Sequence, residues 1–254
     1  MDWLNILILF AVGGIAGFMN VMAGGGSALT LPVLIFMGLD SALANGTNRI
    51  AIFIQNIFAI LSFRQQKLHQ FKTSFMMALW TIPGGLIGAI VAVKISHEWF
   101  QKILAVVLVG VVLSMMFKPN SNKDHTGTQI ENETHHPRKW LLYPSLFGIG
   151  FYGGFIQVGV GFLFMAVLFH LLNISLVKVN MHKVFIVLIY TIPALGIFVW
   201  SGNVDWIKGL SLAAGNAFGA WWGVRFSVKK GDRLIRFVLF AAILIMALKL
   251  LGIF

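Results

Sequence analysis

The chain has 254 residues, of which 58% are hydrophobic and 11% are charged. Because soluble domains carry about 25% charged residues, this composition excludes an ordinary soluble protein and predicts an all-α integral membrane protein. The absence of cysteine excludes disulfides, thiolate catalysis and cysteine-ligated metal centres. The formal net charge of +11 has two explanations, which are basic loops on the cytoplasmic side of a membrane and attraction for an anion.

The first apolar region, residues 4–39, contains the run Gly24-Gly25-Gly26-Ser27. One continuous helix over this region would be about 52 Å long, although about 20 residues suffice to cross the hydrocarbon core of a bilayer. Glycine weakens a helix by about 1 kcal/mol per residue, so we expect two helical arms, residues 4–21 and 27–37, joined by a break at 24–26. Irregular backbone at membrane depth must be surrounded by protein or line a water-filled cavity, which makes the break a candidate binding site.

The rest of the first half alternates spans and short connections. A turn at 38–40 precedes a span over residues 45–63, which opens with Asn45-Gly46-Thr47-Asn48-Arg49 and carries Gln55 further along. The remaining predicted segments are a basic loop at 64–72, a span at 73–93, a short loop at 94–102 and a span at 103–117. Residues 118–139 are polar and almost free of apolar side chains, so we expect a solvated linker there.

The second half follows the same order. An apolar region at 141–172 is interrupted by Gly159 and Gly161, and a span at 180–200 opens with Asn180 and Lys183. The remaining predicted segments are a turn at 201–205, a span at 207–224, a basic loop at 225–236 and a last span that ends at Phe254.

One gapless offset of 135 residues relates the two halves. It places Gly24 on Gly159, Asn45 on Asn180 and Gly84 on Gly219. We therefore expect a duplication with a first transmembrane repeat at 1–117, a linker at 118–139 and a second repeat at 140–254.

Loop charges indicate how the two repeats are oriented. The basic loop at 64–72 corresponds to a neutral segment in the second half, whereas the weakly charged loop at 94–102 corresponds to the strongly basic 225–236. Because cytoplasmic loops carry the excess of Lys and Arg, the sequence predicts two inverted-topology repeats, each a glycine-broken hairpin plus three transmembrane helices. We expect a multi-pass protein of the cell (inner) membrane with a cytoplasmic linker and both termini outside. Eight complete spans would instead make the repeats parallel, and this alternative stays open.

Two cations near the start of predicted spans, Arg49 and Lys183, are the most informative polar residues. A charge near the bilayer centre costs about 2.5–3.5 kcal/mol, so such a residue is by default a functional candidate. The alternative is that both side chains simply reach the headgroups. The neighbouring residues Asn45, Thr47 and Asn48 are typical helix caps, although a helix N-terminus also binds oxyanions.

Gln55 lies seven residues beyond Asn48 and therefore on the same helical face, and Tyr190 holds the equivalent place in the second half. This polar stripe predicts either a cavity lining or hydrogen bonds between helices. The full set of candidate substrate-binding residues is Gly24, Gly25, Gly26, Ser27, Asn45, Thr47, Asn48, Arg49, Gln55, Gly159, Gly161, Asn180, Lys183 and Tyr190. Gln157 and Asn216 are weaker candidates.

Enzyme motifs are absent from the sequence. It has no His-Glu-x-x-His, no phosphate-binding Gly-Lys-Ser/Thr loop and no Gly-x-Ser-x-Gly, and its eight acidic residues lie at termini, loops or span ends. We therefore expect no enzyme activity, no catalytic residue, no metal and no cofactor.

Several motifs together resemble the TauE/SafE-type sulfite exporter family of bacterial membrane transporters. They are residues 17–32 (GFMNVMAGGGSALTLP), Gly38, the run from Ala44 to Arg49, Gly154, Gly159, Gly161 and residues 215–223. The resemblance covers the chain apart from 118–139. It implies transport of small sulfur-containing anions, such as sulfite or sulfonates, out of the cytoplasm.

Three functions remain for comparison. The first is a secondary carrier that binds a small oxyanion in mid-membrane between the two glycine breaks. The others are a passive anion channel and a non-transporting membrane scaffold. The expected partners are a small anionic substrate and the lipid bilayer, with coupling to a proton or sodium ion and a homodimer left open. We exclude nucleic acid, because the basic residues lie in short loops between spans.

Overall fold

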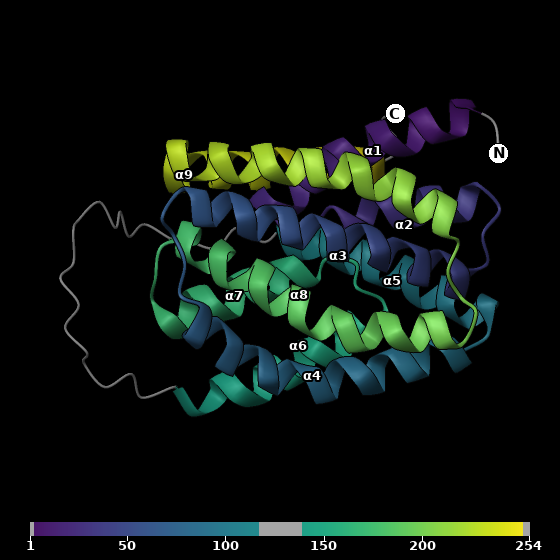
Figure 1. The fold of residues 1–254 in the computed structure, drawn as a ribbon, viewed down its shortest axis with the longest axis horizontal. Helices are drawn as coiled ribbons and strands as arrows, with labels where there is room; N and C mark the ends of the chain where they lie inside the picture. The colour runs from purple at the N-terminus through teal and green to yellow at the C-terminus, as the bar shows by residue number, and fades with distance from the viewer. Residues whose placement is uncertain (1–2, 117–138, 251–254) are drawn as a thin grey trace.

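The computed structural model describes residues 3–116 and 139–250, and within these ranges the regular elements are all helices. The elements that Figure 1 shows are α1 (Trp3–Met22), α2 (Ser27–Phe36), α3 (Ser41–Gln65), α4 (Phe71–Lys94), α5 (His97–Met116), α6 (Lys139–Phe155), α7 (Val160–Leu172), α8 (Leu176–Trp200) and α9 (Trp206–Leu250). Three of these helices, α1, α4 and α8, are long and apolar enough to cross a membrane. The predicted linker at 118–139 lies outside the described residues except for Lys139.

The first break lies where the glycine run predicts it, because α1 and α2 are separated by residues 23–26. Gly24 has a φ of +87°, a left-handed conformation that suits glycine. The second break covers residues 156–159, so the prediction that Gly161 lies in it is wrong, and Gly161 is part of α7. Backbone atoms of Gly161 occupy the place where a Cβ on Gly24 would sit. The first break therefore packs directly against the first turn of α7, which follows the second break.

Helices α3 and α8 begin earlier than the sequence predicts, at Ser41 and Leu176. Alanine and leucine in residues 41–44 favour a helix that starts directly after the turn at 38–40. The interpretation of Asn45, Thr47 and Asn48 as helix caps is wrong, since Asp40 holds the N-cap position. The first N–H groups of α3 are thus about two turns from Arg49, and they do not form the predicted oxyanion site with it.

Helix α9 continues through residues 225–236, where the sequence predicts a basic loop. Arg and Lys are good helix formers and the segment contains no proline, so charge alone does not end the helix. The predicted loop at 94–102 is also shorter than expected, because α5 begins at His97. In both places most of the basic residues therefore lie within helices and not in a loop.

Helices α3 and α8 correspond residue by residue at the offset of 135, and they are antiparallel neighbours. The guanidinium of Arg49 lies 4.7 Å from the ring centroid of Phe198, near the end of α8. Phe63, near the end of α3, packs in one apolar cluster with Val184, near the start of α8. Equivalent helices of the two halves thus run in opposite directions.

The first arm of each half packs against a helix of the other half, α1 on α9 and α6 on α4. Glycines permit these close approaches. Backbone atoms of Asn216 lie where a Cβ on Gly17 would be, and the backbone oxygen of Phe147 lies where a Cβ on Gly84 would be. The two halves are therefore interlocked, and the breaks lie at the interface between them.

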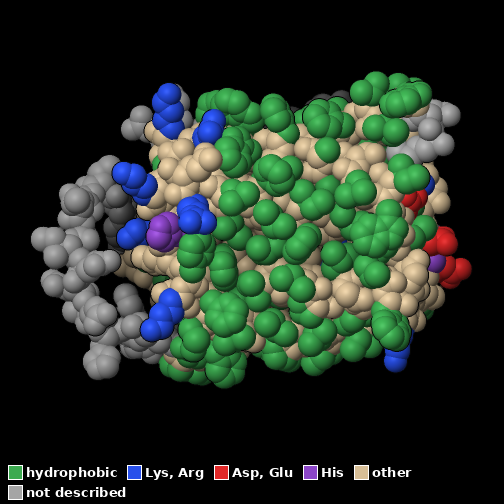
Figure 2. Space-filling model, in the orientation of Figure 1, with side chains coloured by type: hydrophobic (Ala, Val, Ile, Leu, Met, Phe, Trp, Pro, Cys, Tyr) green, Lys and Arg blue, Asp and Glu red, His purple; other side chains and the backbone are tan. Residues whose placement is uncertain are grey.

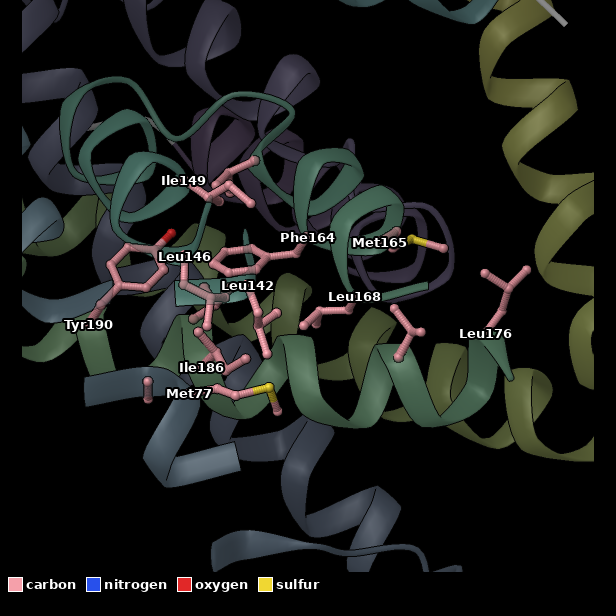
Figure 3. Packing of buried hydrophobic residues seen from close by; sticks show 14 of the residues in the cluster. Met77, Leu142, Leu146, Ile149, Phe164, Met165, Leu168, Leu176, Ile186 and Tyr190 are labelled. Atoms are coloured by element: carbon pink, nitrogen blue, oxygen red, sulfur yellow. The ribbon is translucent and has the colours of Figure 1, made fainter. Parts of the chain in front are cut away.

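An apolar cluster between α4, α6, α7 and α8 holds the second break in place. Figure 3 shows Phe164 and Tyr190 together with Leu146 and Ile186 in this cluster, and the rings of Phe164 and Tyr190 stack with centroids 6.2 Å apart. All four residues are fully buried. Burial of large apolar side chains supplies most of the energy that fixes α7 relative to α8.

Charged side chains are distributed unequally between the two ends of the bundle. Figure 2 shows Lys and Arg gathered at the end where α3 leads into α4, and Asp and Glu at the opposite end. We name the first the basic end, defined by Arg64, Lys67, Lys72 and Arg225, where Arg225 donates to Gln65. At the opposite end Asp205 pairs with Lys208 at 2.8 Å. Partial burial alone raises the pKa of Asp205, but Lys208 brings this pKa below its ordinary value.

The contact between the breaks predicts different effects of alanine at two glycines with the same backbone conformation. Gly24 and Gly38 have φ values of +87° and +86°, but a Cβ on Gly38 meets nothing within 4 Å. Gly38→Ala should lower the free energy of unfolding by about 1 kcal/mol through backbone strain. Gly24→Ala should lower it by a further 1–3 kcal/mol, roughly, because the new Cβ overlaps with Gly161. Thermal unfolding of both variants in detergent measures the difference, and equal midpoints would contradict the contact.

Candidate functional site

A polar cavity lies between the two breaks in the centre of the bundle. Its lining comes from both halves and consists of Asn20, Ser27, Ile52, Gln55, Asn56, Gln157, Val160, Gly161, Lys183, Val184 and Val187. It is narrow and has room for about one water molecule. We call it the central cavity.

Lys183 is the cation of the central cavity. Its Nζ donates hydrogen bonds to Asn20 O at 2.9 Å, to Val21 O at 3.1 Å and to Asn180 Oδ1 at 2.7 Å. The two carbonyls belong to the last turn of α1, where the helix breaks; Asn20 O also accepts from the Gly24 N–H at 2.9 Å, so Lys183 is a second donor to it. A cation at a helix C-terminus also interacts favourably with the helix dipole. The side chain is 3% exposed, so the hypothesis that it reaches the headgroups is wrong.

Arg49 donates to backbone carbonyls at the second break, as Lys183 does at the first, but it does not line the central cavity. Its guanidinium donates to the carbonyls of Gly153 and Gly154, in the last turn of α6. In a continuing helix these carbonyls would accept from the backbone N–H groups of residues 157 and 158, which instead bond to Tyr152 and Ile156. Arg49 is fully buried, so it too does not reach the headgroups. The structure therefore separates the two predicted cations.

The polar residues around Arg49 join helices rather than line the cavity. Thr30 donates from its hydroxyl to Asn48 Oδ1 at 2.7 Å, and Asn45 donates from Nδ2 to Phe155 O at 2.7 Å. Thr47 Oγ1 accepts from the backbone N–H of Asp205 at 2.9 Å. These three side chains tie α3 to α2, α6 and the start of α9.

Several buried donors near the breaks have no hydrogen-bond partner of normal geometry. They include Nδ2 of Asn48, Nδ2 of Asn180, and Nε and Nη1 of Arg49. An unpaired buried donor costs about 1–3 kcal/mol, and native proteins have few of them. Their concentration around two buried cations indicates a region that favours negative charge.

The predicted site residues fall into two groups. Four of them line the central cavity, which are Ser27, Gln55, Gly161 and Lys183. The others are not part of its lining, and they are Gly24, Gly25, Gly26, Asn45, Thr47, Asn48, Arg49, Gly159, Asn180 and Tyr190. Of the predicted glycines, Gly161 is therefore the one in the wall of the cavity.

Sequence reasoning gave too little weight to Asn20, Asn56 and Gln157, which line the cavity. Gln157 lies in the second break with a φ of +62°, and its buried amide has no partner of normal geometry. A polar residue in a strained backbone conformation at a break is a typical sign of function. The position of Gln157 among glycines was the available signal. Among the described residues, no group of three or more His, Asp or Glu side chains could hold a metal ion.

The bonds of Arg49 predict that it stabilises the second break. Arg49→Met should remove the donor of the Gly153 and Gly154 carbonyls and lower the free energy of unfolding by about 1–3 kcal/mol. Arg225→Met is the matched control, because Arg225 also lies over aromatic rings but is only partly buried at the basic end. The unfolding midpoint in detergent should fall for the first variant only, and an unchanged midpoint would contradict this role.

Comparison with known proteins agrees with these features. The family model described as "Sulfite exporter TauE/SafE" matches residues 9–250. The chain is 28% identical to "Probable membrane transporter protein ORF9" of Sinorhizobium sp over 97% of this chain and 92% of that protein. It is 27% identical to "Probable membrane transporter protein YfcA" of Escherichia coli (strain K12) over 96% and 88%, respectively. It is 24% identical to "Probable membrane transporter protein YunE" of Bacillus subtilis (strain 168) over 99% and 100%.

No solved structure matches the chain at a significant level. The family model covers nearly the whole chain, and its name agrees with the motifs of the first break and of α3. The chain therefore belongs to the TauE/SafE sulfite exporter family of membrane transporters.

Proposed function

We propose that this chain is a secondary transporter of a small sulfur-containing oxyanion, such as sulfite or an organosulfonate, which binds in the central cavity between the two breaks. The observation that carries the proposal is the buried ammonium of Lys183 in the wall of that cavity. Among the described residues the one ion pair joins Lys208 and Asp205, so no carboxylate neutralises Lys183. A buried charge without a counter-ion is costly, and a bound anion would remove that cost.

The side chains around Lys183 suit an anion better than a cation. Gln157 has an amide without a partner of normal geometry, which can turn its N–H groups toward an anion, and Asn180 has an Nδ2 group without such a partner next to the ammonium. The carbonyl oxygens that would favour a cation, those of Asn20 and Val21, already accept from Lys183. Amide donors and an ammonium in a space of low dielectric constant bind oxyanions strongly.

Two inverted repeats would provide the transport cycle. Support comes from the constant offset between α3 and α8 and from their antiparallel arrangement. It also comes from the packing of α1 on α9 and of α6 on α4, each of which joins the two halves. In such transporters, rocking of one repeat against the other opens a fixed site alternately to each side. The basic end faces the cytoplasm of the inner membrane by the positive-inside rule, so export moves the anion away from that end.

A carrier fits the central cavity better than a passive channel does. The cavity admits about one water molecule, whereas sulfite has four non-hydrogen atoms, so the site must widen to take up its substrate. A conformational change in every cycle is the property that distinguishes a carrier from a pore. Coupling to a proton or sodium ion, and assembly as a homodimer, are compatible with this proposal and are not required by it.

Flux measurements on purified protein in proteoliposomes test the role of the two cations. Lys183→Ala should lower sulfite or sulfonate flux at least about tenfold, which corresponds to about 1.4 kcal/mol of lost binding, whereas Arg49→Ala should lower flux by destabilising the second break. Lys178→Ala is the matched control, because Lys178 lies on the same helix with an exposed side chain and should keep normal flux. Normal flux in Lys183→Ala would rule out the central cavity as the anion site.

Counterflow separates the carrier from the channel. Unlabelled sulfite on the far side of the membrane should accelerate uptake of labelled sulfite, because a carrier returns faster when it is loaded. A channel gives no such acceleration. Uptake that does not respond to sulfite on the far side would favour the passive anion channel.

A further inference from the structure

A second cavity lies between the central cavity and the basic end. We call it the outer cavity, and its lining consists of Ile60, Phe63, Leu68, His69, Gln70, Phe71, Ser74, Met181, Val184 and Phe185. It includes the loop between α3 and α4, residues 66–70, which lies at the basic end. His69, Gln70 and Ser74 give this lining its polar groups.

Val184 belongs to the lining of both cavities, and it is the one residue that they share. Its side chain is 1% exposed and packs in an apolar cluster with Phe63 and Met181. Lys183, the preceding residue, faces the central cavity. Val184 therefore lies between the two cavities, next to the buried cation and on the side of the basic end.

The position that corresponds to Val184 in the first half is built in a different way. At the offset of 135, Arg49 takes the place of Val184 and Phe198 that of Phe63. The guanidinium of Arg49 lies over the Phe198 ring at 4.7 Å and also bonds to the carbonyls of Gly153 and Gly154. Hydrogen bonds and a cation–π contact hold Arg49 in place, whereas Val184 packs in an apolar cluster.

From this asymmetry we propose that Val184 is the gate between the outer and the central cavity, so that the solute enters from the basic end while Arg49 keeps the opposite route closed. The inference rests on the proposed transport function. The basic side chains Arg64, Lys67 and Lys72 lie in or beside the loop between α3 and α4, which contributes residues to the lining of the outer cavity, and they raise the local concentration of anions. A small apolar partition excludes water and ions until it moves aside.

The absence of cysteine from the chain allows a direct test without a background of other thiols. Asn56→Cys places one thiol in the wall of the central cavity. The probe is methanethiosulfonate ethylsulfonate, an anionic thiol reagent that does not cross membranes, added on the side of the basic end. The measured quantity is the rate at which this thiol is modified.

Val184→Ala in the Asn56→Cys protein should accelerate the modification about tenfold, because the partition loses two methyl groups. Val184→Ile enlarges the partition and should slow the reaction. Val187→Ala is the matched control, since Val187 is also buried but lines only the central cavity, and the rate should stay unchanged. Normal elution in size-exclusion chromatography verifies the fold of each variant.

Equal modification rates in the alanine and isoleucine variants at Val184 would overturn the gate. Sulfite flux through the wild-type protein is measured separately, so the two proposals fail in different ways. Normal sulfite flux together with equal modification rates in the Val184 variants would disprove the gate and leave the transport function standing. Absent sulfite flux together with the expected modification rates would disprove sulfite transport and leave the route from the basic end standing.

Discussion

Backbone groups freed inside the membrane are the constraint on which this structure depends. Each half contains a helix that stops at depth, and the carbonyls of its last turn need donors that lipid does not supply. Lys183 donates to the end of α1, and Arg49 donates to the end of α6. Each cation comes from the half opposite to the helix that it satisfies. The breaks can therefore exist only when the two halves are assembled.

The same arrangement accounts for the charge of the site. Burying a cation in a membrane only to bond a carbonyl has a large free-energy cost. Among the described residues no carboxylate neutralises Lys183 or Arg49 and so lowers this cost. Lys183 lies in the wall of the central cavity, beside amide donors without a partner of normal geometry. Arg49 lies outside this cavity, over the ring of Phe198. In our proposal Lys183 meets the anion, whereas Arg49 stabilises the second break.

The sequence predicts the position of the first break and the turn at 201–205, because glycine runs and hydropathy act locally, but it places the second break too late, at Gly159 to Gly161 instead of residues 156–159. It did not predict that α3 and α8 begin a turn earlier, since their buried polar residues look like caps when burial is unknown. It also offered a signal that separates Arg49 from Lys183, which the pairing of the two cations overlooked. At the offset of 135, Lys183 matches Asn48 and not Arg49, and a shift of one residue turns a side chain by about 100° around a helix. Lys183 accordingly bonds to the end of α1 and Arg49 to the end of α6.

Selenite, the selenium analogue of sulfite, provides the most direct test of the central claim. A structure determined in its presence should show anomalous density in the central cavity, within hydrogen-bond distance of Lys183 Nζ and next to Gly161. Density confined to the basic loop at residues 66–70, with none between the breaks, would contradict the account.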